Sequence, residues 1–290
     1  MSRPGFVLVV HGGAGRPPKL SGWHAEAEAG MREAAQAGER ILAARGTAAE
    51  AVVAAVRELE SCPAFNAGLG SVANTEGMVE MDAALMEGVE LRAGAVAGLR
   101  AIRHPIEAAR AVLEAGVHLL YAGEGAECFA REAGLEGIEP AVLAAAAPEW
   151  KAASSQGTVG AVALDNAGHL AAATSTGGTP GKRPGRISDS AIIGAGTWAD
   201  DASCAVSTTG HGESFMRCVF AHAVAERCRG GLALPEACAQ MLTRVEELGG
   251  KGGCIAVDRQ GNVAYPYDTR IMPRAVVREG AAPEITIGTS

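Results

Sequence analysis

The first half of the chain alternates between short apolar runs and segments with helical spacing. A continuous apolar run over residues 6–10 is bounded by glycines and predicts a short buried strand. Small and apolar residues then recur at helical spacing over residues 24–44. A second helix follows from Thr47, where Glu50 completes a capping-box pattern, and runs to about residue 59. The other elements expected in this half are strands over residues 79–86 and 94–99 and a helix opened by Pro105.

The second half is dominated by hairpins and helices. An apolar strand over residues 159–164 is followed by a turn at Asn166-Ala167-Gly168 and a second strand over residues 169–175. Before them, residues 133–156 show little pattern and predict an exposed linker. Strands with paired helices in each half suit an α+β fold with helices outside and sheets inside. The remaining expected elements are a hairpin of residues 254–257 and 263–265 and helices over residues 213–229 and 235–248.

The composition is typical of a compact globular protein. Hydrophobic residues make up 48% and charged residues 20% of the 290 residues, which excludes an intrinsically disordered chain. The length suits one large domain or two small ones. Glycine is abundant, at 39 residues, and its clustering in short runs indicates tight turns and close backbone approaches. A net charge of −8 without a basic stripe argues against nucleic acid and anionic membranes as partners.

Cysteine usage and the N-terminus predict a cytoplasmic protein. The seven cysteines are an odd number and form no C-x-x-C pair, as expected of free thiols in a reducing compartment. The apolar run near the N-terminus is too short for a signal sequence or a membrane span. The seven histidines show no H-E-x-x-H spacing, which argues against a catalytic zinc, and no organic cofactor is expected.

Thr158, which follows Gly157 and precedes an expected strand, is the candidate for chemistry. Cleavage of the bond between these two residues would leave a threonine with a hydroxyl nucleophile and a free α-amine. An alkyl hydroxyl needs an adjacent base. An α-amine with a pKa of about 7.7–8.0 is roughly 15% neutral at pH 7 and can serve. For an arbitrary Gly–Thr pair, a threonine that merely opens a strand is the simpler interpretation, and here the surrounding motifs argue against it.

Arg186 and Asp189 share a loop that glycine and proline punctuate. The head group of an amino acid is a zwitterion, so its binding site needs one cation and one anion. A guanidinium can hold a carboxylate through two parallel hydrogen bonds. Without neighbouring motifs, a surface ion pair worth about 0–1 kcal/mol would be the simpler interpretation. The run STTGHG at residues 207–212 adds a hydroxyl and glycine N–H groups that suit an oxyanion hole.

A series of motifs runs in order over nearly the whole chain. They are HGGAG (11–15), LESCPAFNAGLGS (59–71), GAVAGLRAIRHPIEAAR (94–110), GEGAECFA (123–130), GTVGAVALD (157–165), ATSTGG (173–178), GRISDSAIIGAGTWAD (185–200) and STTGHGESFMR (207–217). In this order they resemble the plant-type asparaginase and isoaspartyl peptidase family of N-terminal-nucleophile hydrolases. Each glycine-rich piece alone is weak evidence, whereas the ordered set is highly specific.

This resemblance carries implications for fold and activity. It implies an αββα four-layer sandwich and self-cleavage of a single domain, 1–290, into 1–157 and 158–290. It implies that the resulting αβ heterodimers dimerise. It also implies hydrolysis of β-aspartyl (isoaspartyl) dipeptides and of the side-chain amide of L-asparagine, through a β-aspartyl-enzyme intermediate.

The resemblance also assigns roles within the site. The roles are the nucleophile (Thr158), a hydroxyl beside it (Thr176), oxyanion donors (Thr209 and Gly210), a guanidinium for the substrate α-carboxylate (Arg186), a carboxylate for the substrate α-ammonium (Asp189), further substrate contacts (Gly210, Gly212 and Asn66) and a cleavage site (Gly157 and Thr158). A structural sodium ion is implied on backbone carbonyls of the loop after the second expected helix. Its ligands would be the carbonyls of Leu59, Glu60, Cys62, Phe65, Ala67 and Leu69.

The HGGAG motif admits other interpretations, and two segments depart from the family pattern. HGGAG lacks the Lys-Ser/Thr of a phosphate loop, and the chain has no G-x-S-x-G elbow of an esterase. We therefore expect a structural turn near the site. His104 stands where the family has asparagine, a better helix N-cap. The run YPYDTRIMPR (265–274) replaces a more usual Phe-Asn-Thr-x-Gly-Met pattern.

The sequence thus predicts a cytoplasmic β-aspartyl peptidase with asparaginase activity. One alternative is a related amidase that cleaves glycosylated asparagine, although that activity belongs to secreted or lysosomal compartments. Another is a non-catalytic relative that binds aspartyl ligands without turnover. Release of ammonia from asparagine separates the enzymes from the binding protein, and a β-aspartyl dipeptide assayed against a glycosylated asparagine separates the two enzymes.

Overall fold

The strands form two sheets in the computed structural model, which describes residues 5–18, 21–146 and 157–288. The larger sheet has the order β12–β11–β1–β5–β6–β2–β3–β4, with strands β1 (Val7–His11), β2 (Met81–Glu87), β3 (Ala93–Leu99), β4 (Leu120–Ala122), β5 (Val159–Leu164), β6 (Leu170–Thr176), β11 (Arg274–Arg278) and β12 (Glu284–Thr286). The smaller sheet has the order β10–β9–β8–β7, with strands β7 (Thr197–Ala199), β8 (Cys204–Gly210), β9 (Gly252–Asp258) and β10 (Val263–Ala264).

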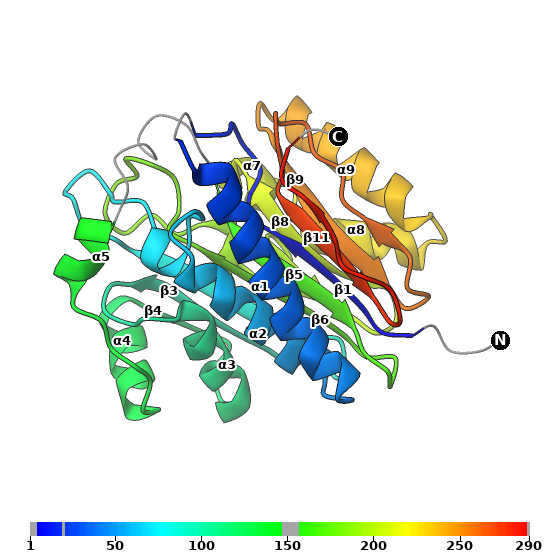
Figure 1. Ribbon diagram of the computed structural model, residues 1–290, viewed down its shortest axis with the longest axis horizontal. Coiled ribbons are helices and arrows are strands. Elements are labelled where there is room, and N and C mark those ends of the chain that lie inside the picture. The colour runs from blue at the N-terminus through cyan, green and yellow to red at the C-terminus, as the bar shows by residue number, and fades with distance from the viewer. Residues whose placement is uncertain (1–4, 19–20, 147–156, 289–290) are drawn as a thin grey trace.

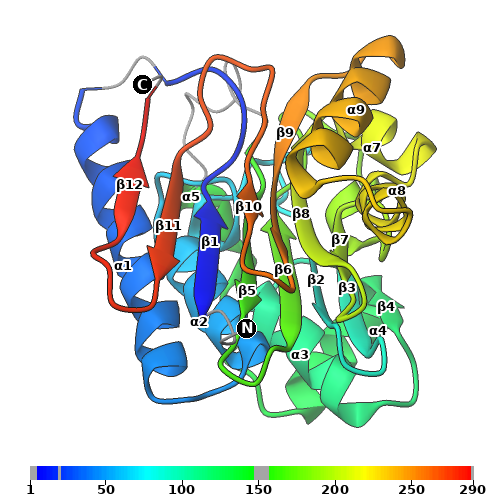
Figure 2. The ribbon, with the colours of Figure 1, turned by 90° about the vertical axis from the view of Figure 1, so that its right-hand side faces the viewer.

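Helices cover the sheets from outside. The helices are α1 (Trp23–Ala43), α2 (Ala48–Ser61), α3 (Pro105–Ala115), α4 (Gly123–Glu132), α5 (Pro140–Ala146), α7 (Gly212–Arg217), α8 (Phe220–Arg229) and α9 (Leu234–Glu247). The helices α1, α2 and α3 pack on the larger sheet, whereas α8 and α9 pack on the smaller one. Figures 1 and 2 show α1 and α9 on opposite sides of the molecule with strands between them. The expected mixed α and β organisation is therefore confirmed. Within the described residues, no helix is long and apolar enough to span a membrane.

Successive side chains of the central strands point alternately to the two faces of the larger sheet, so this sheet packs against the helices on one face and against the smaller sheet on the other. In β1, Leu8 and Val10 belong to the core beneath the helices, whereas Val7 and Val9 belong to the core between the sheets. Successive side chains of a strand point to opposite faces, so a strand covered on both faces is apolar throughout. The run of buried residues in β5 has the same origin. The sequence signal of these two strands is therefore strong.

Most predicted elements are confirmed, with two corrections. The capping box at Thr47 and Glu50 is formed, and the β5–β6 hairpin is present, with β6 shifted by one residue from the expected 169–175 to Leu170–Thr176. The helix expected over residues 213–229 is instead two helices, α7 and α8, separated at Val219, whose φ is +47°. Backbone carbonyls of residues 194 and 195 accept hydrogen bonds from N–H groups in the first turn of α8. These N–H groups therefore find partners outside the helix, which allows a new helix to begin here.

The second correction concerns the expected exposed linker. Its residues 140–146 form α5, whose Leu143 is buried, and residues 147–156 lie outside the described part of the chain. The hydrophobic pattern also missed β8, because that strand carries Ser207, Thr208 and Thr209 in an otherwise apolar run. Other elements without a prediction are β4, α4, β7, β11 and β12.

Candidate active site

The register of the β5–β6 hairpin brings two threonine hydroxyls together. Val159, the first residue of β5, pairs with Ser175 of β6. Thr158 therefore lies beside Thr176, the last residue of β6. The Oγ1 atom of Thr158 donates to Oγ1 of Thr176 over 3.1 Å, and that oxygen also accepts the N–H of Gly178 over 3.0 Å. The candidate nucleophile is thus held by a hydroxyl that the following turn fixes.

The smaller sheet supplies Thr209 from the end of β8. The Oγ1 atom of Thr209 lies 3.3 Å from the backbone nitrogen of Thr158 and 3.0 Å from that of Ala14. Both nitrogens donate to this oxygen. A hydroxyl that accepts two hydrogen bonds still has its own proton to donate. Thr209 can therefore offer a donor to a third group beside Thr158, as an oxyanion hole requires.

The HGGAG loop that follows β1 lies against the Gly157–Thr158 bond. Gly13 has a φ of +104°, in the left-handed region, and a Cβ atom there would lie only 2.7 Å from Cα of Gly157. The same atom would lie 3.3 Å from the backbone nitrogen of Thr158. Only glycine allows this conformation together with this approach. The motif is thus a turn near the site, as the sequence predicted.

Behind the bond lies His11, which the sequence did not single out as a site residue. It is fully buried at the end of β1, and its Nε2 atom lies 3.0 Å from Oγ of Ser207. Burial lowers the pKa of His11 to about 3, although a hydrogen bond with the backbone of Thr158 opposes the shift. The ring is neutral at pH 7. Two more hydroxyls continue this chain of hydrogen bonds between the sheets. Oγ1 of Thr174 lies 2.8 Å from Oγ of Ser207, and Oγ1 of Thr197 donates to Oγ1 of Thr174 over 2.7 Å.

The structure brings Asp189, Arg186 and Gly212 together. Asp189 is buried, and its carboxylate accepts a hydrogen bond from the hydroxyl of Thr208 over 2.8 Å. A Cβ atom on Gly212 would lie 2.6 Å from Oδ1 of Asp189 and 2.8 Å from Nη2 of Arg186. An anion and a cation therefore converge on the backbone of Gly212. Burial raises the pKa of Asp189 to about 6, against the opposing effects of Thr208 and Arg186.

Arg186, Asp189 and Gly212 together are called the clamp here. Glu213 lies beside the clamp, which the sequence did not reveal. The Nε atom of Arg186 donates to Oε1 of Glu213 over 3.0 Å. The side chain of Arg186 is 16% exposed and that of Glu213 is 47% exposed. Arg186 is therefore paired with Glu213, and the simple surface ion pair between Arg186 and Asp189 is not formed. Because Glu213 is well solvated, an incoming carboxylate can take its place on the guanidinium at modest cost.

Two carboxylates of the β2 region hold the loop that carries the clamp. Lys182 is buried and donates through Nζ to the carbonyl oxygen of Glu80. The carboxylate of Glu80 accepts the N–H of Gly185, and that of Asp82 accepts the N–H of Ser188 over 2.8 Å. Burial lowers the pKa of Lys182, while Asp82 and Glu80 oppose that shift. The loop is therefore tied to the sheet at both ends.

Asn66 lies beside Gly157 and fixes the turn after β6. Its Nδ2 atom donates to the carbonyl oxygen of Gly178 over 2.7 Å, and its Oδ1 atom accepts the N–H of Val72 over 2.9 Å. A Cβ atom on Gly157 would lie 3.4 Å from Cβ of Asn66. The side chain is thus buried and positioned next to Gly157.

The backbone carbonyl oxygens of the loop after α2 are the groups there that could hold a monovalent cation. Carbonyl oxygens of Leu59 and Cys62 accept the N–H groups of Cys62 and Phe65, each over 3.2 Å. The carbonyl of Ala67 accepts the N–H of Gly70 over 3.0 Å. Each carbonyl keeps a second lone pair, and the end of a helix favours positive charge. Among the described residues, no group of three or more His, Cys, Asp or Glu side chains could hold a metal.

The side chain of Glu60 links this loop to the site. Its carboxylate accepts the hydroxyl of Ser175 over 2.6 Å and the N–H of Ile106 over 3.0 Å. Burial raises the pKa of Glu60, and a contact with His104 opposes the shift. Glu60, rather than His104, therefore caps the N-terminus of α3. It also fixes Ser175, the neighbour of Thr176.

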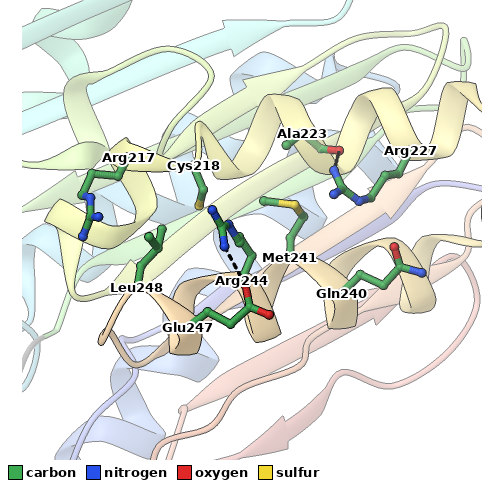
Figure 3. Close-up of a pocket in the computed structure, with 9 residues that line it drawn as sticks. All are labelled: Arg217, Cys218, Ala223, Arg227, Gln240, Met241, Arg244, Glu247 and Leu248. Atoms are coloured by element: carbon green, nitrogen blue, oxygen red, sulfur yellow. Dashed lines mark hydrogen bonds and ion pairs between the residues drawn. The ribbon is translucent and has the colours of Figure 1, made fainter.

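A separate hollow lies between α7, α8 and α9 (Figure 3). Its volume is about 630 Å³, and Arg217, Arg227 and Arg244 line it with the thiol of Cys218. Burial raises the pKa of that thiol, so it is a poor nucleophile at pH 7. Arg244 is paired with Glu247 over 2.7 Å. This hollow shares no lining residue with the Thr158 site.

Comparisons with known proteins show the family of the chain. The family model described as Asparaginase matches residues 4–155 and 145–287. An isoaspartyl peptidase of Salmonella typhimurium is 43% identical, over 96% of each chain. An isoaspartyl peptidase of Escherichia coli is also 43% identical, over 96% of this chain and 94% of its own. An isoaspartyl peptidase/L-asparaginase of Rattus norvegicus is 40% identical, over 95% of this chain and 87% of its own. The chain therefore belongs to the asparaginase family.

Proposed function

We propose that the protein is a self-cleaving hydrolase of β-aspartyl dipeptides and of the side-chain amide of L-asparagine. The observation that carries this proposal is the position of Thr158. Its hydroxyl lies 3.1 Å from that of Thr176, and its backbone nitrogen lies 3.3 Å from Oγ1 of Thr209. The names of the relatives, isoaspartyl peptidase and isoaspartyl peptidase/L-asparaginase, support the same substrates.

Self-cleavage begins with attack of the Thr158 hydroxyl on the carbonyl carbon of Gly157. The acyl group moves from nitrogen to oxygen, and the nitrogen takes up the hydroxyl proton. Water then hydrolyses the ester and separates residues 1–157 from 158–290. The close approach of the Gly13 backbone to Gly157 supports this step, because it holds the bond to be cleaved in place.

Turnover uses the α-amine that cleavage releases on Thr158. The amine takes the proton of its own hydroxyl, and the oxygen attacks the side-chain carbonyl carbon of the substrate. The hydroxyl of Thr209 and the N–H of Gly210 stabilise the oxyanion, and Thr176 orients the nucleophile. The leaving nitrogen takes the proton from the α-ammonium as the carbon–nitrogen bond breaks. Water then releases aspartate from the β-aspartyl ester.

The clamp selects an aspartyl head group. Arg186 binds the α-carboxylate of the substrate, and Asp189 binds its α-ammonium together with the backbone of Gly212. Asn66 orients the amide that is cleaved. Arg186 and Asp189 both face Gly212. An acylated head group, which carries only the carboxylate charge, would therefore leave Asp189 without an ionic partner. That requirement favours free amino-acid head groups over acylated ones.

The remaining features concern assembly. We propose that the two chains stay together as an αββα four-layer sandwich of the N-terminal-nucleophile type and that two such αβ units form a dimer in the cytoplasm. The loop after α2 holds a sodium ion through carbonyl oxygens, and the reaction needs no organic cofactor. The second lone pairs of these carbonyls and the end of α2 support the sodium proposal.

Mass spectrometry beside hydrolysis assays tests the proposal. Purified protein should separate into chains of residues 1–157 and 158–290, and it should release ammonia from asparagine and leucine from β-Asp-Leu. Glycosylated asparagine should be a poor substrate. Thr158→Ala should remain one inactive chain, whereas Thr158→Ser should cleave slowly and keep weak activity. Wild-type protein that stays full length yet is fully active would refute the amine-as-base mechanism.

Replacement of Thr209 separates the oxyanion hole from the nucleophile. Thr209→Val keeps the shape and removes the hydroxyl donor, and loss of one such donor costs roughly 10²–10³ in kcat. Turnover close to the parent rate would place the stabilising donor elsewhere. Cleavage should be measured on the same samples, because Thr209 also lies next to the nitrogen of Thr158.

A further inference from the structure

We propose that the leaving residue of a β-aspartyl dipeptide binds in the space beside Gly157, with its α-carboxylate on Arg16 and its side chain against Ile271. This inference rests on the proposed function and deepens it. Asparagine releases ammonia, which reaches neither residue. The space would therefore set the preference for peptides over asparagine and the preference among peptides.

Proton transfer determines where the leaving residue lies. As the acyl bond breaks, its electron pair goes to the leaving nitrogen, which must take a proton from the α-ammonium of Thr158. Proton transfer needs a separation of about 2.6–3.2 Å. In the uncleaved chain, the carbonyl group of Gly157 is attached to the α-nitrogen of Thr158. The leaving residue must therefore occupy the side of Thr158 from which Gly157 departs.

A small pocket already exists on that side. Its volume is about 20 Å³ in the uncleaved chain, and its lining includes Gly157, Asn66, Phe65, Trp23, Ile271 and Arg16. Cleavage frees Gly157 to leave, which enlarges the space. The pocket is thus a cleft between the HGGAG loop and the residues that follow α2, with Gly157 as one wall.

Arg16 provides the charge that a dipeptide needs. Its side chain is exposed, and it forms no ion pair among the residues that the structure describes. The preceding residue, Gly15, exchanges two backbone hydrogen bonds with Ile271, over 3.0 and 3.1 Å. The loop that carries Arg16 is therefore fixed at the rim. A guanidinium at this position matches the free α-carboxylate of a leaving amino acid.

Apolar side chains, among them Trp23, Phe65 and Ile271, make up much of the remaining lining, together with the polar Asn66. The family pattern Phe-Asn-Thr-x-Gly-Met has glycine at the position that Ile271 occupies in YPYDTRIMPR. The indole of Trp23 is fixed by a hydrogen bond from Nε1 to the carbonyl of Ala64, over 3.2 Å. Together these side chains would contact an apolar leaving residue. We therefore expect β-Asp-Leu to be preferred over β-Asp-Gly.

Kinetics with matched substrates test the role of Arg16. Arg16→Gln should lower kcat/KM for β-Asp-Leu by about two- to fivefold, relative to asparagine, as expected for an exposed charge pair. The C-terminal amide, β-Asp-Leu-NH₂, lacks the carboxylate, so the substitution should not change its value relative to asparagine. Arg57→Gln is the control, because Arg57 is an exposed arginine on α2. Equal effects on the acid and the amide, or no effect, would overturn the assignment.

Ile271→Ala tests the apolar wall. The ratio of kcat/KM for β-Asp-Leu to that for β-Asp-Gly should fall about tenfold, since a lost apolar contact has that effect on discrimination. An unchanged ratio would overturn this part of the proposal. A parent protein that cleaves neither peptides nor asparagine would refute the proposed function instead. Normal asparagine turnover with unchanged peptide ratios would refute only the present inference.

Discussion

At the scale of single residues, the environment of each group decides what it can do. Asp189 and His11 are both fully buried, and burial moves their pKa values in opposite directions, to about 6 and about 3. Burial favours the neutral form of each group, which is the acid for aspartate and the base for histidine. Asp189 therefore changes its charge about one pH unit below neutral. His11 stays neutral at pH 7 and acts as a hydrogen-bonding group.

The pKa of Asp189 predicts a pH-dependent KM. In the proposed clamp, the ionised carboxylate binds the substrate ammonium, and burial makes it protonate as the pH falls through about 6. KM for asparagine should therefore rise about tenfold between pH 7 and pH 5. The folded-state pKa lies above the ordinary 3.8, so this protonation stabilises the folded chain as the pH falls, and unfolding through this group cannot explain the rise. A KM that stays constant over this range would contradict the assignment.

The geometry of Arg186 predicts that lysine cannot replace it. Arg186→Lys keeps the charge but loses the two parallel hydrogen bonds, so kcat/KM for asparagine should fall more than about tenfold. Self-cleavage should continue, because the precursor presents no free α-carboxylate to this residue. Arg183→Lys, an exposed change in the same loop, is the control and should have parent kinetics. Near-normal kinetics in Arg186→Lys would remove Arg186 from the clamp.

At the scale of elements, the site is made from the ends of strands. The end of β1, the start of β5 and the end of β6 meet because their antiparallel registers pair His11 with Gly160 and Val159 with Ser175. The end of β8 reaches the same point from the other sheet. Loops and turns at strand ends then supply the glycines that allow close approach.

The HGGAG turn predicts a specific defect in cleavage. Gly13→Ala places a methyl group 2.7 Å from Cα of Gly157 at a φ of +104°. We expect the cleavage rate to fall at least about tenfold, because strain and displacement of the scissile bond add up to more than about 1.4 kcal/mol. Gly77→Ala has a comparable φ of +78° but nothing within 4 Å. It should cleave at the parent rate in the same mass-spectrometric time course, and equal rates for both variants would contradict the role of the turn.

At the scale of the whole molecule, two sheets from distant parts of the chain complete one site. Thr176 ends a strand of the larger sheet and Thr158 directly precedes another, whereas Thr209 lies on the smaller sheet. The core between the sheets holds them in register through residues such as Val9, Val162 and Ile255. Stability of this packing therefore determines whether the site forms.

The proposed sodium ion predicts a cation-specific gain in stability. A ligand that binds only the folded state at 100 times its Kd contributes about 2.7 kcal/mol. The Tm in sodium chloride should therefore exceed that in choline chloride at equal ionic strength. Gly68→Ala, whose methyl group would lie 2.2 Å from the carbonyl oxygen of Glu60, should abolish the difference. Identical Tm values in the two salts would refute the site.

The sequence alone determined the elements with strong periodicity and the residues with strong motifs. The apolar runs of β1 and β5 and the capping box of α2 were predicted, because local spacing and local hydrogen bonds create those signals. Thr158, Arg186 and Asp189 were predicted from motifs, and their roles stay predictions. The strand β8 was missed, because its buried hydroxyls resemble a polar loop until their partners are known.

The tertiary structure alone decided which groups meet. Nothing in the local sequence indicates that Glu60 caps α3 or that Glu213 pairs with Arg186, because each contact joins residues far apart in the chain. The break between α7 and α8 has the same origin, since carbonyls from another loop satisfy the first N–H groups of α8. Burial, and therefore the pKa of Asp189 and His11, also exists only after the two sheets pack. Local chemistry is written in the sequence, whereas proximity and desolvation arise from the fold.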